Sequence, residues 1–134
     1  EEEEVIDLVT PIIHFSFTRS NILTTDKKGF SIKVSNGAEC VDSRTEKYRL
    51  YRSQEKFENY EMVKEVNVSD FSFVFEDRTV DMIAGNVYYY RVSAVCGKSE
   101  KRSSKGIEIV ISKSMAEKGV VDNASRSKIK LFSF

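Results

Sequence analysis

The sequence contains little of what catalytic and metal sites are usually made of. Its 134 residues include one histidine, His14, and two cysteines, Cys40 and Cys96, which form no Cys-x-x-Cys pair. The common spacings of zinc sites and of redox-active dithiols are therefore absent, and so is a glycine-rich phosphate-binding loop. We predict a protein that is not an enzyme and has no cofactor and no metal site.

Strong charge of one sign and long apolar runs are also absent. The 21 basic and 21 acidic residues cancel, so no overall field directs the chain to nucleic acid or to an anionic membrane. No apolar run approaches the roughly 20 residues of a membrane-spanning helix. The chain does not begin with Met, and no apolar signal segment precedes its charged start. We interpret it as a mature form or as a piece of a longer protein.

The length of the chain allows one domain, and the charge is uneven between its two ends. Residues 1–9 form an acidic leader, and residues 114–134 form a polar linker or tail in which basic side chains outnumber acidic ones. We interpret both ends as solvated tails and place the domain at residues 10–113. The last seven residues, 128–134, are apolar again and could form an extra strand.

Alternation of apolar and polar residues predicts an all-β protein. In Phe30–Ser35, for example, every second residue is apolar, which suits a strand with one buried face. No convincing helix is present, because Ser114–Glu117 has the spacing of a capping box but Gly119 follows within a turn. Polar or glycine-containing breaks separate the strands that we expect. These are Pro11–Thr18, Gly29–Ser35, Lys47–Ser53, Tyr60–Val66, Phe71–Glu76, Val87–Cys96 and Ile107–Ser112.

One stretch of the sequence resembles the most diagnostic part of a fibronectin type III domain. It is Met82–Val95, in which a turn containing Gly85 is followed by Tyr88 and an alternating apolar run. Lys47–Ser53 is similar to strand C of bacterial members, and Phe75–Asp77 to the end of their strand E. The resemblance implies an antiparallel seven-strand Ig-like sandwich, whereas periodicity alone also permits a small barrel. It further implies that Tyr88 is a buried corner tyrosine whose hydroxyl bonds to nearby backbone.

The sequence also departs from the family. The tryptophan usual in strand B is missing, and Ala84 replaces the proline of the turn before Gly85. The Arg-Gly-Asp tripeptide by which some members bind integrins is absent. The expected fold stands, but the best-known adhesive function of the family is not expected here.

The resemblance places both cysteines at the same end of the sandwich. Cys40 falls in the loop between strands B and C, and Cys96 falls at the end of strand F. Because fibronectin-like modules are usually exported, we expect a Cys40–Cys96 disulfide. Two unpaired neighbouring thiols are the alternative.

Strand alternation and the family's strand order predict one candidate binding face. Arg49 and Tyr51 should point outward from strand C, and Tyr89 and Arg91 outward from its neighbour, strand F. The four would form one patch of residue types that are enriched at protein interfaces. An ordinary sheet face with cross-strand pairs is the alternative.

The function implied by the resemblance is that of an extracytoplasmic binding or spacer module. Such a module would belong to a bacterial surface, periplasmic or lipoprotein component and would bind protein or carbohydrate. One alternative is an accessory module of a secreted polysaccharide-degrading enzyme. Another is a self-assembly domain that contacts neighbouring domains or copies of itself.

Overall fold

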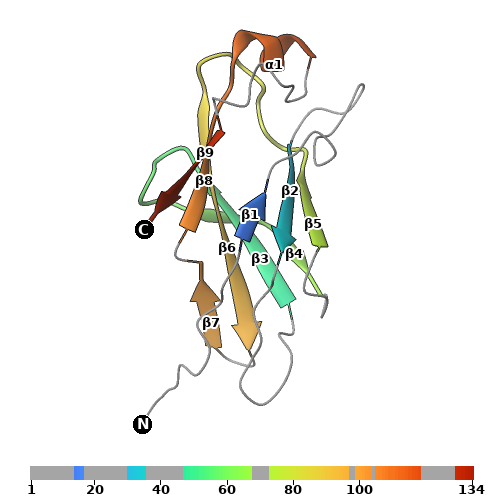
Figure 1. The fold of residues 1–134 in the computed structure, drawn as a ribbon, viewed down its shortest axis with the longest axis vertical. Helices are drawn as coiled ribbons and strands as arrows, with labels where there is room; N and C mark the ends of the chain where they lie inside the picture. Colours follow the sequence, from blue (N-terminus) through green and yellow to red (C-terminus); the bar gives the residue numbers. More distant parts are fainter. Residues whose placement is uncertain are drawn as a thin grey trace.

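Two antiparallel sheets and one short helix make up the described part of the chain (Figure 1). The computed structural model describes residues 14–16, 30–35, 47–67, 73–96, 99–103, 105–118 and 129–134. The elements are β1 His14–Ser16, β2 Phe30–Ser35, β3 Lys47–Ser53, β4 Glu61–Val66, β5 Phe73–Asp77, β6 Val87–Cys96, β7 Ser99–Arg102, β8 Lys105–Val110, α1 Lys113–Lys118 and β9 Ile129–Ser133.

Each of the seven expected strands has a counterpart, and two further strands are present. β9 is the extra C-terminal strand that the apolar last residues allowed. β7 is not among the expected strands, because its sequence, Ser99–Arg102, lacks apolar alternation and lies in the break between Val87–Cys96 and Ile107–Ser112. It pairs with the end of β6 beyond the reach of β8. This polar segment is therefore a strand through its backbone pairing with β6, without apolar alternation.

The smaller sheet has the order β1-β2-β5, and the larger one the order β4-β3-β6-β8-β9, with β7 also paired to β6. In the larger sheet Tyr51 of β3 lies opposite Arg91 of β6. Gly106 of β8 lies opposite Phe132 of β9. By this register, the sheet face that carries Tyr51 and Arg91 continues across β8 to the C-terminal strand β9.

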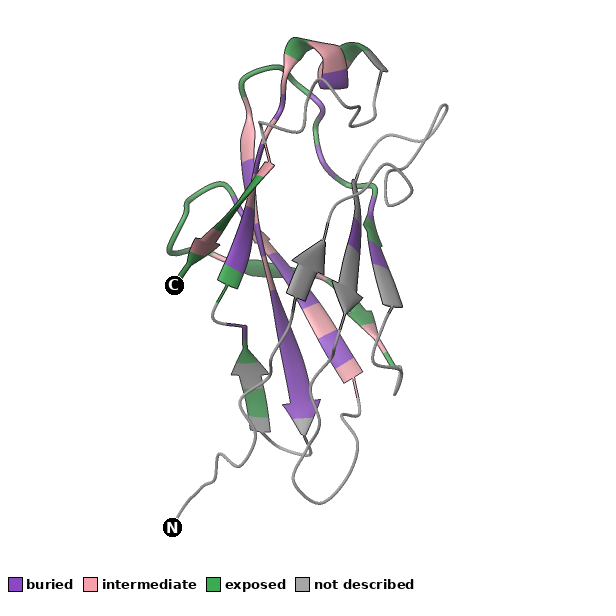
Figure 2. Cartoon of the chain, viewed as in Figure 1, coloured by how far each residue is buried: buried purple, intermediate pink, exposed green. Residues whose placement is uncertain are grey.

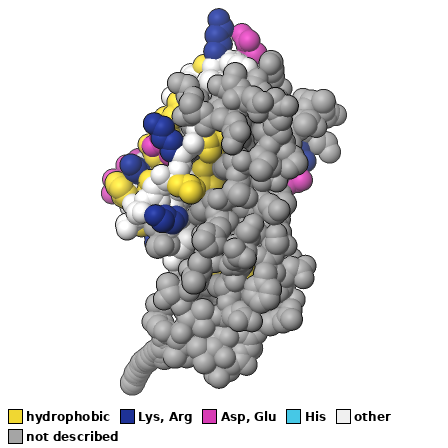
Figure 3. All heavy atoms as spheres, in the orientation of Figure 1, with side chains coloured by type: hydrophobic (Ala, Val, Ile, Leu, Met, Phe, Trp, Pro, Cys, Tyr) yellow, Lys and Arg dark blue, Asp and Glu magenta, His cyan; other side chains and the backbone are white. Residues whose placement is uncertain are grey.

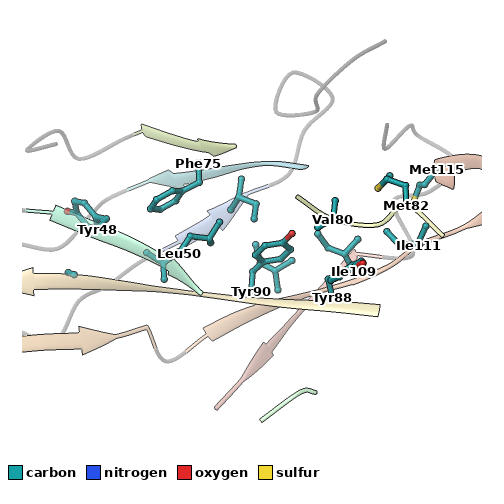
Figure 4. Packing of buried hydrophobic residues seen from close by; sticks show 14 residues of the cluster. Tyr48, Leu50, Phe75, Val80, Met82, Tyr88, Tyr90, Ile109, Ile111 and Met115 are labelled. Carbon is teal, nitrogen blue, oxygen red and sulfur yellow. The ribbon is translucent and has the colours of Figure 1, made fainter. Parts of the chain in front are cut away.

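Both sheets contribute side chains to one hydrophobic core (Figures 2 and 4). Ile32 of β2 and Phe75 of β5 represent the smaller sheet and are fully buried. The larger sheet contributes the alternating residues expected to point inward, which are Tyr48, Leu50, Tyr88, Tyr90, Val92, Ala94, Ile107 and Ile109. The side of the larger sheet that carries Tyr51 and Arg91 is therefore its outer face.

The connection between β5 and β6 is held by Tyr88 and by a tight turn. The Tyr88 hydroxyl donates to the Asp81 carbonyl oxygen and accepts from the Asp81 N–H, each at 3.0 Å. In the turn, the Asn86 N–H donates to the Ile83 carbonyl oxygen at 3.0 Å. Gly85 has φ +95°, a conformation that favours glycine at the third position of such a turn. The burial of Tyr88 and its bond to nearby backbone are thus both observed.

Replacing Tyr88 with phenylalanine is expected to lower the free energy of unfolding by about 1 to 2 kcal/mol, because both backbone groups of Asp81 lose a partner. Chemical denaturation measures this. Tyr60→Phe is the matched control, since that hydroxyl bonds only the exposed Lys56 carbonyl. An unchanged midpoint for Tyr88→Phe would show that water replaces the hydroxyl.

The helix α1 corrects the expectation that this segment supports a single turn at most. Its N-cap is Ser112, not Ser114: the Met115 N–H donates to Ser112 Oγ at 3.1 Å, and the Ala116 N–H to the Ser112 carbonyl at 2.9 Å. Met115 is completely buried beside Met82 and Ile111 (Figure 4). Tertiary burial of one methionine stabilises a helix that local sequence alone supports weakly.

Candidate functional site

The four residues of the expected binding face lie together on the outer face of the larger sheet. Arg49 and Tyr51 project from β3, and Tyr89 and Arg91 project from the adjacent β6. Tyr51 lies directly opposite Arg91. Alternation therefore predicted correctly which side of the sheet these residues occupy.

Part of the face is covered by side chains of β7, which pairs with β6 in the same sheet. Tyr51 is on the outer face, as expected, but it is only 8% exposed. Its hydroxyl donates to Glu100 of β7, and the Arg102 guanidinium lies 4.5 Å from the centre of its ring. Arg49 donates to Glu100 at 2.9 Å and to Glu65 at 2.7 Å. The β3 half of the face is thus occupied by contacts within the chain.

Glu100 is the carboxylate that organises this half of the face. It accepts hydrogen bonds from Ser93, Tyr51 and Arg49. Partial burial acts to raise its pKa, but these hydrogen bonds and the charge of Arg49 lower the pKa overall. Glu100 therefore stays ionised at neutral pH, and both of its oxygens are already engaged.

The other half of the face carries an aromatic patch that sequence reasoning did not identify. The Phe132 ring lies 5.7 Å from that of Tyr89, and the Phe134 ring lies 5.6 Å from that of Tyr60. Phe57, in the β3–β4 connection, contacts both phenylalanines at 6.0 Å. We call these five residues the aromatic patch. It joins the C-terminus to the β3–β4 connection, which Figure 1 shows side by side.

The aromatic patch is partly open to solvent and carries cations. Phe57 is 63% exposed. The Lys56 ammonium lies over the rings of Phe57 and Phe132, and the Arg91 guanidinium lies 3.7 Å from the centre of the Phe134 ring. Figure 3 shows apolar and basic side chains next to one another on this side of the molecule. A mixed apolar and cationic surface of this kind suits an anionic partner with apolar side chains.

A sequence signal for the patch existed in β9. Phe132 and Phe134 alternate with Ser133, so both point to one face. That this face is the one carrying Tyr89 follows only from the pairing of β9 with β8.

Gly106 makes the close approach of the C-terminal rings feasible. A methyl group at this position would lie 2.6 Å from Phe132 Cζ and 2.8 Å from Phe134 Cε2. We expect Gly106→Ala to lower the free energy of unfolding by about 1 to 2 kcal/mol, because the rings must shift. Denaturation should show a smaller loss when the substitution is made in a Phe132→Ala background. An equal loss in both backgrounds would contradict a clash with these rings.

The expected disulfide falls outside the described residues. Cys40 is not among them, and only the backbone of Cys96 is described, at the end of β6. The disulfide remains a prediction: thiol titration of the unfolded, unreduced chain should find no free thiol. Two free thiols in protein kept under oxidising conditions would refute it.

The described residues offer no metal site. Among them, no group of three or more histidine, cysteine, aspartate or glutamate side chains could hold a metal ion. His14 is part of β1, but its side chain is not described. A small cavity of about 130 Å³ lies at the edges of β4 and β5, lined by Val63, Lys64, Glu76, Asp77, Arg78 and Thr79.

No helix within the described ranges has the length and apolar character to cross a membrane. A scan against protein-family models finds no match to the chain, and a search of the curated proteins finds none either. The link to fibronectin type III domains therefore rests on sequence motifs, and we treat it as a proposal.

Proposed function

We propose that the chain is a non-catalytic binding or spacer module built as a fibronectin type III-like sandwich. The strand order supports this proposal most directly. If β1, β2 and β5 are strands A, B and E, then β3, β6 and β8 are the adjacent strands C, F and G. Tyr88 then sits at the corner before strand F, with the hydroxyl bond to backbone expected there.

The aromatic patch supports a binding role over a purely spacing one. Aromatic rings and arginine are the residue types most enriched where proteins meet. Here they gather on one face, with Phe57 more than half exposed. Much of the rest of that face is engaged by Glu100, so we place the partner-binding surface at the aromatic patch instead of around Tyr51.

We place this function outside the cytoplasm, as in the families of exported modules that the sequence resembles. The Cys40–Cys96 disulfide, if present, would favour this compartment, because disulfides persist in oxidising environments. The partner in this proposal is a protein.

Site-specific photo-crosslinking in the cells that express the protein tests the proposal. A photoreactive phenylalanine analogue is placed at Phe57 and, as the control, at Ile83, which is similarly exposed but lies in the β5–β6 connection. We expect a discrete cross-linked protein from position 57 and none from position 83. Absence of any adduct from position 57, or equal adducts from both positions, would overturn the proposed binding surface.

A further inference from the structure

Two arginines on the outer face differ from the other described arginines in having no carboxylate partner among the described residues. Arg49, Arg52 and Arg78 each have a carboxylate oxygen within 2.9 Å. Arg91 and Arg102 form no ion pair with any described residue. Within the described part of the chain, Arg91 and Arg102 are therefore two neighbouring positive charges without a carboxylate partner.

The two guanidinium groups are held in place by aromatic rings. Arg91 stacks on Phe134 at 3.7 Å, and its Nε donates to the Ser103 carbonyl oxygen at 2.7 Å. Arg102 stacks on Tyr51 at 4.5 Å, and Tyr51 lies opposite Arg91 in the sheet. Their positions are therefore fixed by packing, while the terminal amino groups of Arg91 form no hydrogen bond with any described residue. Burial and the charge of Arg102 together lower the pKa of Arg91, as expected for neighbouring cations.

Exposed apolar side chains flank the arginines. Met62 of β4 lies opposite Tyr51, and Phe57 and Phe134 lie on the other side, all three exposed. A small inorganic anion would satisfy the arginines but would leave these apolar groups in water. A peptide with carboxylates next to apolar residues would engage both.

The chain itself contains one segment of that chemistry. Residues 1–9 carry five carboxylates, Glu1 to Glu4 and Asp7, together with four apolar residues. We propose that Arg91 and Arg102 receive the carboxylates of this acidic segment from a second copy of the chain. The inference rests on the proposed binding role and names the partner. Two copies exchanging equivalent segments form a symmetric, closed dimer.

Exchange between copies fits the fold better than docking within one copy. The acidic segment precedes β1, which belongs to the smaller sheet. That sheet packs on the inner face of the larger one, since Ile32 and Phe75 share a core with Tyr90. Arg91 and Arg102 lie on the opposite, outer face. A segment of the same copy would have to pass around the edge of the larger sheet to reach them.

Sedimentation velocity of the full chain over about two decades of concentration tests the inference. We expect the parent chain to form a dimer at low salt. Its dissociation constant should rise at least about tenfold in the double variant Arg91→Gln/Arg102→Gln. The same rise is expected in a variant with Glu1 to Glu4 all changed to Gln. Raising the salt from about 0.05 M to about 0.5 M should weaken the dimer similarly. Arg78→Gln, which removes an exposed arginine that is already paired, should dimerise like the parent chain.

A pair of charge-reversal variants distinguishes loss of the dimer contact from misfolding of the arginine variant. Arg91→Glu/Arg102→Glu should not self-associate, and mixing it with a variant in which Glu1 to Glu4 are changed to Lys should restore a dimer. A chain that stays monomeric throughout, or a dimer that all variants retain, would overturn the inference.

A labelled glutamate-rich peptide separates failure of this inference from failure of the proposed function. If the chain is monomeric but binds this peptide through the two arginines, the occupant is an acidic segment of another protein, and the binding role stands. If no dimer forms, the peptide does not bind and position 57 gives no adduct, both proposals fail.

Discussion

Replacing Asp77 with alanine is expected to lower the free energy of unfolding by about 3 kcal/mol, because its carboxylate joins the two sheets. Asp77 ends β5 of the smaller sheet and is 3% exposed. Its Oδ2 accepts from Arg52 and from the Tyr90 hydroxyl, both in the larger sheet and both at 2.7 Å. Its Oδ1 accepts from the Thr79 hydroxyl at 2.6 Å and from the Thr79 N–H at 3.0 Å. The substitution takes an acceptor from each of these groups at once.

Chemical denaturation of the full chain and of Asp77→Ala measures this loss. Glu76→Ala is the matched control, because the neighbouring Glu76 is exposed and bonds only Arg78. The control should change the free energy of unfolding by less than about 0.5 kcal/mol. A loss below about 1 kcal/mol for Asp77→Ala would mean that water enters and replaces the carboxylate.

The same carboxylate makes stability depend on acid pH. Burial alone would raise the pKa of Asp77, but hydrogen bonds from Thr79, Tyr90 and Arg52 hold the pKa below its ordinary value. The unfolded chain therefore takes up this proton at a higher pH than the folded chain does. The contribution of Asp77 is fully present above about pH 4 and is lost as the pH falls through the lower pKa of the folded state. Asp77→Ala should show a flatter decline of stability over that acid range.

The sequence predicted the inner face of the larger sheet more completely than its outer face. Tyr88, Tyr90 and Val92 alternate along β6, and burial against one core follows from alternation alone. Alternation also assigned Tyr51 to the outer face, but it says nothing about what lies over that face. The polar strand β7 brings Glu100 and Arg102 onto Tyr51 through pairing with β6, which no local pattern reveals.

The C-terminal segment was the part hardest to interpret from local sequence. From Ser114 onward the composition is polar, and a polar composition predicts a linker. Met115 is an exception to this composition: it is fully buried in the core, on a helix whose N-cap is Ser112. A helix cap and a single apolar side chain are weak sequence signals, although together they pack α1 against the core.

Replacing Met115 with alanine is therefore expected to lower the free energy of unfolding by about 3 kcal/mol, the usual loss when a buried methionine leaves a cavity. The side chain is 0% exposed and packs with Met82 and Ile111 at one end of the core (Figure 4). Lys113→Ala on the same helix is the control, because Lys113 is exposed and should change stability by less than about 0.5 kcal/mol.

Denaturation monitored by far-UV circular dichroism provides the measurement for Met115. A single transition shifted to lower denaturant would mean that α1 unfolds together with the sheets and belongs to the domain. If Met115→Ala unfolds at the same denaturant concentration as the parent chain, packing of the helix contributes little to the free energy of unfolding. The segment after β8 would then be the linker that its composition predicts. Because β9 follows α1 in the chain, loss of this packing would also remove a constraint that holds Phe132 against Tyr89.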